Sequence, residues 1–120
     1  MKKSKLSVRP TTKADLLEIY GVIKFPTLIA RTLVVNGKPA GCFGVSKVEG
    51  KWQVFVDVKA EARAHKFWVV REGKKMLRYL EHVVGIKCMY AVADFSEPTA
   101  HRWLTNEGFT PLRGDIYVRE

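Results

Sequence analysis

A group of cationic side chains in one predicted helix is the part of this sequence best suited to chemistry. Within residues 60–84 lie Arg63, His65, Lys66, Arg71 and Lys74. The whole chain carries 21 Lys and Arg against 12 Asp and Glu, a formal net charge of +9. A surplus of this size attracts polyanions such as nucleic acid, coenzyme A or an acidic protein. A basic helix face is also commonly a solvated surface, and the sequence leaves both interpretations open.

The residue types that bind metals are too dispersed to form a site. His65, His82 and His101 have no cysteine or second histidine at ligand spacing, so we predict no metal. Cys42 and Cys88 each fall among the apolar residues of a predicted strand. This placement favours buried, reduced thiols over a disulfide.

Three tryptophans have two possible roles. Beside basic residues, Trp52, Trp68 and Trp103 could stack on nucleic acid bases, as aromatic side chains do in single-strand binders. Their spacing fits the buried faces of strands and helices better. We therefore expect them in the core.

Length and composition predict one domain over residues 1–120, with residues 1–5 as a disordered basic tail. The chain has 120 residues, of which 47% are hydrophobic, which is enough for a single core. No apolar run approaches the roughly 20 residues that cross a bilayer. The basic start is not followed by an apolar signal core, so we expect a cytoplasmic protein that does not bind membranes.

The first elements are a short strand and a helix. Leu6 to Arg9 predicts the strand. Thr12 and Asp15 have the spacing of a capping box, which predicts a helix from Lys13 to about Tyr20. Gly21 is a suitable helix stop.

The next part predicts three antiparallel strands. Asn36-Gly37 favours a type I′ hairpin that pairs Ile29–Val35 with Lys38–Val45. Glu49-Gly50 marks a second turn. Lys51–Val58 then alternates apolar and polar residues, which indicates a central or near-central strand.

The second half alternates helices and strands. Ala60 to Val84 has the periodicity of one long helix. Ile86 to Ala93 is a continuous apolar run, typical of a mid-sheet strand covered on both faces. Glu97 to Glu107 predicts a further helix, and two short strands follow at Phe109–Leu112 and Asp115–Val118. The order predicts an α/β fold, of the α+β type with a mixed sheet.

This order and three local segments resemble the GNAT (GCN5-related N-acetyltransferase) family. The segments are Val8-Arg9-Pro10 with Thr12 and Asp15, the hairpin Asn36 to Gly41, and Ala100, Arg102, Trp103 and Leu104 followed by Gly108-Phe109. Together they span nearly the whole chain. The short length most resembles small GNAT-like proteins encoded by tailed phages. Only about twenty residues, Pro10 to Ile29, join the first two strands, so the fold is truncated where many GNATs carry a longer helical pair.

The resemblance implies an acetyl-CoA site at the fourth strand and the start of the following helix. In the family a loop with the pattern Gln or Arg, two residues, Gly, one residue, Gly or Ala binds the pyrophosphate. Aligned on Met76 and Leu77, only Gly73 matches this pattern. Either side-chain charge replaces the loop, or no coenzyme A binds. The implied cofactor-binding residues are Val58, Lys59, Arg63, His65, Arg71, Gly73, Lys74 and Ser96.

The resemblance also implies a base for the amine and an acid for the leaving thiolate. The position of the family's tyrosine acid is occupied by Leu104. Asp57 is the best-placed base, with Glu61 next, and Tyr90 is a substitute acid. Asp57 lies on the polar side of its strand, so the other interpretation is an ordinary exposed residue without a catalytic role.

Two functions remain open at this stage. The first is an N-acetyltransferase that moves acetyl from acetyl-CoA to an amine, with an amine of a protein as one candidate acceptor. The second is a catalytically inactive GNAT-fold protein that binds a host protein or nucleic acid through its basic surface. We favour the acetyltransferase, as a monomer or dimer, with a protein acceptor or acidic partner ahead of nucleic acid.

Overall fold

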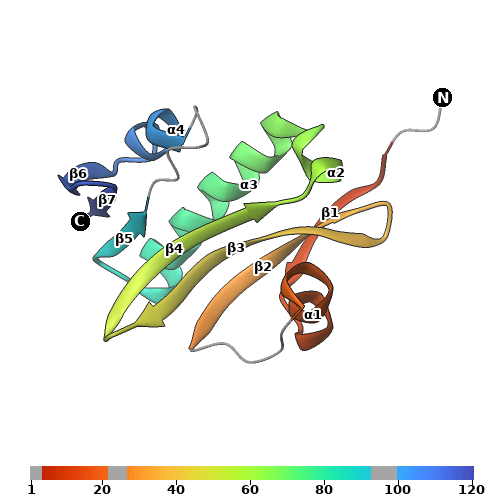
Figure 1. The fold of residues 1–120 in the computed structure, drawn as a ribbon, viewed down its shortest axis with the longest axis horizontal. Coiled ribbons are helices and arrows are strands. Elements are labelled where there is room, and N and C mark those ends of the chain that lie inside the picture. Colours follow the sequence, from red (N-terminus) through yellow and green to blue (C-terminus); the bar gives the residue numbers. More distant parts are fainter. Residues whose placement is uncertain (1–3, 22–26, 93–99) are drawn as a thin grey trace.

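The computed structural model describes residues 4–21, 27–92 and 100–120 (Figure 1). In these ranges seven strands form one mixed sheet in the order β1-β2-β3-β4-β5-β7-β6. Only the β4–β5 pair is parallel. The strands are β1 (Leu6–Pro10), β2 (Leu28–Val35), β3 (Lys38–Val48), β4 (Lys51–Val58), β5 (Met89–Val92), β6 (Thr110–Arg113) and β7 (Ile116–Arg119). The predicted mixed sheet and the central position of β4 are confirmed.

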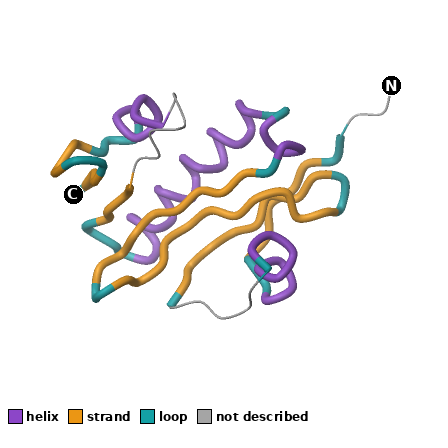
Figure 2. Tube along the Cα trace, in the orientation of Figure 1, coloured by secondary structure: helices purple, strands orange, loops and turns teal. Residues whose placement is uncertain are grey.

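Helices cover the two faces of the sheet unequally (Figure 2). The core packs between the sheet and the pair α3 (Lys66–Tyr79) and α4 (Ala100–Asn106), with Phe43, Met76 and Leu104 among its buried members. On the opposite face, α1 (Lys13–Tyr20) contacts β3. We call these the α3 face and the α1 face. Within the described ranges α1 is the only helix on its face.

Local signals placed α1 and the two hairpins correctly. The Thr12 hydroxyl accepts the Asp15 amide, and the Asp15 carboxylate accepts the Thr12 amide at 3.0 Å, which completes the predicted capping box. Asn36 and Gly37 have φ of 51° and 81°, as a type I′ turn requires. Lys5 exchanges hydrogen bonds with Asn36, so the prediction of a disordered tail is wrong at that residue.

The predicted single helix at residues 60–84 is wrong. The chain forms a short α2 (Ala60–Arg63), breaks at Ala64 and His65, and resumes as α3, which ends in a π-helical turn η1 (Leu80–Val84). Ala62 and Trp68 are both buried. In one continuous helix these two residues would point about 120° apart, and the break lets both face the core.

The predicted strand at residues 86–93 starts later and is covered differently. β5 begins at Met89, so Cys88 lies outside the strand and is half-exposed, whereas Cys42 is buried in β3. Ala91 is buried on the α3 face, but Val92 is 52% exposed. Cover on both faces was therefore a wrong expectation. Its mid-sheet position, between β4 and β7, is confirmed.

Gly44 is required by a close approach of β3 to β2. A Cβ atom there would lie 2.1 Å from the Ile29 carbonyl oxygen, so the backbone would have to shift. We expect Gly44→Ala to lower the free energy of unfolding by about 1 to 3 kcal/mol more than Gly50→Ala. Gly50 also has a positive φ, of 77°, but has open space around it. Urea unfolding of both variants tests this, and equal losses would contradict it.

Candidate active site

The described pairing between β4 and β5, in the middle of the sheet, is short. Among the described residues the two strands pair at Gln53 with Tyr90 and at Val54 with Ala91, and β4 continues to Val58. The two-residue turn at Glu49-Gly50 makes alternate residues of β4 bond to β3. By this alternation the backbone N–H and C=O of Val56 point toward the β5 side.

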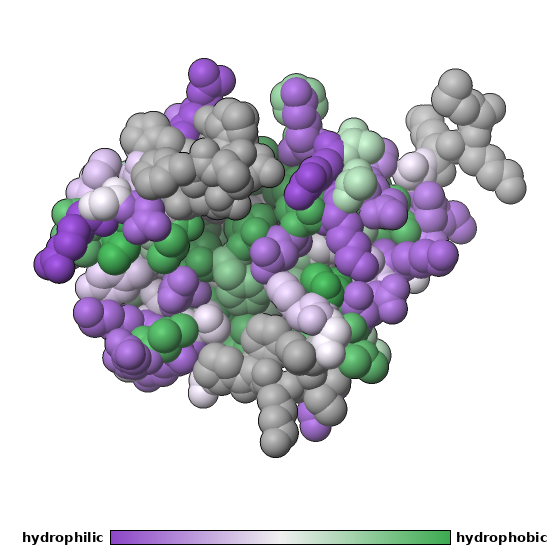
Figure 3. Space-filling view, viewed as in Figure 1, coloured by the Kyte–Doolittle hydropathy of each residue, from purple (hydrophilic) through white to green (hydrophobic). Residues whose placement is uncertain are grey.

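A cavity of about 780 Å³ lies beside this pairing. The centre of the face in Figure 3 is hollowed and apolar, with polar residues around it. The α3 face contributes Phe43, Val69, Val70, Gly73, Trp103 and Leu104 to its lining. The α1 side contributes Ile19, Tyr20, Gln53, Phe55 and Asp57. The cavity therefore has walls from both faces of the sheet.

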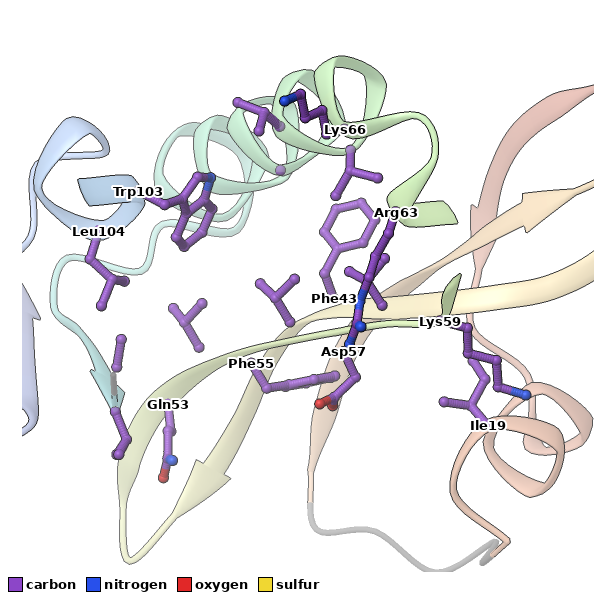
Figure 4. Close-up of a pocket in the computed structure, with 18 of the residues that line it drawn as sticks. Ile19, Phe43, Gln53, Phe55, Asp57, Lys59, Arg63, Lys66, Trp103 and Leu104 are labelled. Carbon is purple, nitrogen blue, oxygen red and sulfur yellow. The ribbon is translucent and has the colours of Figure 1, made fainter. Parts of the chain in front are cut away.

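Three cations line the cavity: Lys59, Arg63 and Lys66. Figure 4 shows Lys66 on the helical side of β4, Arg63 extending from α2 toward Asp57, and Lys59 beside Ile19 of α1. The Lys59 ammonium donates to the Glu18 carbonyl at 3.3 Å. α3 starts at Lys66, and His65 before it makes no side-chain cap. First-turn amides have no partner within their helix, so this end suits an anion.

Of the other predicted cofactor residues, Val58 and Gly73 line the same cavity as Lys59 and Arg63, whereas His65, Arg71 and Lys74 do not. Gly73 lies in the middle of α3 rather than at its start. A Cβ atom added at Gly73 would lie 3.4 Å from the Trp103 ring. Arg71 is exposed away from the cavity, and Lys74 faces Glu107 at 3.8 Å. Because α3 is continuous over these positions, the alignment that placed Gly73 in a phosphate loop is corrected. His65 packs edge-on against Trp68, and Ser96 lies outside the described residues.

Asp57 is placed on the α1 face together with a tyrosine that sequence reasoning missed. The Tyr20 hydroxyl, at the end of α1, donates a hydrogen bond to the Asp57 carboxylate. Burial, the hydrogen bond to Asp57 and nearby negative charge raise the pKa of Tyr20 strongly. Tyr20 therefore stays protonated and remains a donor. In the sequence, Tyr20 was marked only by its place on the apolar face of the predicted helix, and this place gave no indication of a contact with Asp57.

Tyr90 does not lie where a partner of Asp57 would. It is level with Gln53, four residues before Asp57, which is about 13 Å along a strand. Its ring does not line the cavity and lies 5.3 Å below the Lys51 ammonium. A hydrogen bond with Cys88 is the main cause that raises the pKa of Tyr90. The structure gives no support to Tyr90 as the acid. Glu61 is exposed and also lies outside the cavity.

The remaining candidates fall into the core or form no cluster. Trp68 is buried, and Trp52 and Trp103 pack against the core as half-buried side chains. Among the described residues no three His, Cys, Asp or Glu side chains come close enough to hold a metal ion. In the same part of the chain, no helix is both long and apolar enough to cross a membrane.

Comparison with known proteins identifies the fold. The sequence matches no family model and no curated protein. A variant of spermidine N-acetyltransferase SpeG from Vibrio cholerae aligns with a TM-score of 0.72 at 11% identity, over 94% of this chain and 91% of that one. The aminoglycoside acetyltransferase AAC(6')-Ib in complex with coenzyme A aligns with a TM-score of 0.64 at 13% identity, over 96% and 94%.

A third structure is longer than this chain. An acetyltransferase from Agrobacterium tumefaciens strain C58 aligns with a TM-score of 0.62 at 9% identity, and the match spans 64% of its length. At these identities the likeness shows the fold alone. The chain has the mixed α/β fold of GNAT acetyltransferases, with the cavity lined by β4 and β5.

Proposed function

We propose that this protein is an N-acetyltransferase that moves the acetyl group of acetyl-CoA to an amine. The observation that carries the proposal is the cavity with walls from both faces of the sheet. It is lined by Lys66 at the start of α3, by Arg63 and Lys59, and by a carboxylate, Asp57, on the α1 face. An anionic donor and a cationic acceptor can enter from opposite faces and meet between β4 and β5.

The described residues fit acetyl-CoA through charge and backbone groups. The N–H and C=O of Val56 can bond the amides of the pantetheine arm. Lys59, Arg63 and Lys66, with the first amides of α3, can bind the pyrophosphate. Counted from Arg63, the family pattern puts Lys66 and Trp68 at its glycine positions. Cationic side chains would therefore bind the pyrophosphate in place of the backbone amides that a glycine loop brings close to it.

Asp57 is the proposed base. The amine nitrogen attacks the thioester carbonyl, a C–N bond forms, and the amine proton passes to the Asp57 carboxylate. The C–S bond then breaks, and the thiolate leaves and takes a proton from water. The Tyr20 hydroxyl donates a hydrogen bond to the Asp57 carboxylate.

We propose a protein amine as the acceptor. In the described ranges α1, of eight residues, is the one helix on the acceptor face. Asp57 is exposed there, beside the half-buried Phe55. An open face of this kind admits a side chain or terminus presented on a larger molecule.

Calorimetric titration tests the donor site. We expect acetyl-CoA to bind with micromolar affinity and more tightly than ADP or desulfo-CoA. The double variant Arg63→Ala/Lys66→Ala should bind roughly tenfold or more weakly, because two charged contacts to the pyrophosphate are lost. Arg71→Ala/Arg78→Ala removes the same charge from exposed positions of α3 and should change little. No binding at millimolar acetyl-CoA would reject the proposal.

A second candidate is a binding protein without catalysis. The net charge of +9 and the lack of a glycine between Lys51 and Glu72 favour it. It is also compatible with the resemblance to small proteins of tailed phages. In this case acetyl-CoA binding would be absent, and binding to a nucleic acid would weaken steeply with salt because counterions are released.

A further inference from the structure

α1 is held to the sheet by an unusual buried carboxylate. Asp15 is 1% exposed and accepts the Arg9 guanidinium at 2.6 Å, the Thr12 amide at 3.0 Å and the Thr32 hydroxyl at 3.0 Å. A helix of eight residues is marginal by itself and depends on tertiary contacts. The position of its last residue, Tyr20, therefore depends on this anchor.

Polar contacts continue from the anchor to the cavity. The Thr32 hydroxyl oxygen also lies within hydrogen-bond distance of the Thr11 hydroxyl, at 3.0 Å, and Thr11 lies 3.5 Å from the Cys42 sulfur. Cys42 is the cross-strand partner of Asp57. Burial raises the pKa of the Cys42 thiol, although its hydrogen bonds with Thr11 and Tyr20 oppose this. A neutral thiol beside Asp57 adds no charge.

The groups that face Asp57 come from three elements and one linker. Tyr20 reaches it from α1 and donates a hydrogen bond, and neutral Cys42 lies beside it on β3. Arg63 of α2 and Lys59, which follows β4, line the same cavity and supply positive charge. Tyr20 is the one of these four whose direct hydrogen bond to the carboxylate is established.

We propose that Tyr20 is the positioning residue for Asp57: it orients the carboxylate in the α1-face mouth of the cavity, while the Asp15 anchor fixes Tyr20. The inference rests on the proposed function, since it assigns a partner to the proposed base. It adds a residue from α1, an element that the acetyl-CoA site does not use. Loss of the Tyr20 hydroxyl should lower the rate of the step that uses Asp57 without changing the affinity for acetyl-CoA.

Tyr20→Phe tests this with kinetics. We expect kcat to fall about tenfold, because the carboxylate loses the donor that orients it. The acetyl-CoA affinity should stay the same. Tyr79→Phe removes a hydroxyl from the α3 face and should leave kcat unchanged. An unchanged kcat in Tyr20→Phe would overturn the proposal.

A second measurement separates failure of this inference from failure of the proposed function. The Asp57 carboxyl carbon can be followed by NMR at neutral pH, without any substrate. Its resonance should move in Tyr20→Phe and stay in place in Tyr79→Phe, because only the first change removes its hydrogen-bond donor. If no variant transfers acetyl but the resonance moves, Tyr20 still positions Asp57 and the proposed reaction is wrong. An unmoved resonance in Tyr20→Phe would reject the role of Tyr20 whatever the activity.

Discussion

Asp57→Asn is expected to lower kcat for amine acetylation at least 100-fold at neutral pH. A positioned base contributes about 10² to 10⁴ to the rate, and asparagine keeps the size of the side chain without its basicity. Acetyl-CoA affinity should change less than twofold, because Asp57 lies on the α1 face, whereas Lys66 and the first amides of α3, which would bind the pyrophosphate, belong to the α3 face. Steady-state kinetics beside calorimetry measure both quantities.

The pH dependence of this loss is a further check. At high pH more of the acceptor amine is already unprotonated, so the defect in Asp57→Asn should shrink as the pH rises. Asp115→Asn removes a carboxylate from the exposed turn between β6 and β7 and serves as the control. Wild-type kcat in Asp57→Asn would show that Asp57 is an ordinary exposed strand residue.

Asp15→Ala is expected to lower the free energy of unfolding by about 2 to 4 kcal/mol. The change removes half of the capping box and leaves the Thr32 hydroxyl and Arg9 without their acceptor. Domains are stable by only about 5 to 15 kcal/mol, so this is a large part of the total. Glu18→Ala, at an exposed position of the same helix, should cost less than about 0.5 kcal/mol.

The same carboxylate predicts how stability varies with acid. Burial opposes ionisation of Asp15, but hydrogen bonds from Arg9, Thr12 and Thr32 outweigh it, so its pKa lies below 3.8. A lowered native pKa adds stability above the unfolded pKa of about 3.9, and this stability is lost as the pH falls through the native pKa. The stability difference between wild type and Asp15→Ala should therefore narrow below about pH 4. A constant difference from pH 7 to pH 2 would contradict the assignment.

Much of the fold follows from signals that act within a few residues. The Thr12–Asp15 capping box and the Asn36-Gly37 turn depend on side chains and φ values inside their own segments, and both were predicted. Periodicity indicated the helical character of residues 66–79. Periodicity did not show the break at His65, which allows Ala62 and Trp68 both to be buried in the same core.

The site depends on contacts between distant segments. The partner of Asp57 is Tyr20, 37 residues away, and no periodicity or spacing connects them. Gly73 matched a phosphate-loop pattern in sequence, but the register of α3 puts it against Trp103. In both cases packing decided which side chains meet.

The sequence by itself determined the turns, the helix start at Thr12, the order of strands and helices, and Asp57 as a carboxylate on β4. Only the tertiary structure decided that the described pairing of β4 with β5 is limited to Gln53 and Val54, that the cavity has walls on both faces of the sheet, and that Tyr20 meets Asp57. The physical reason is the range of the interactions. Caps, turns and periodicity are local, whereas strand pairing and side-chain contacts depend on how α1, α3 and α4 pack on the sheet.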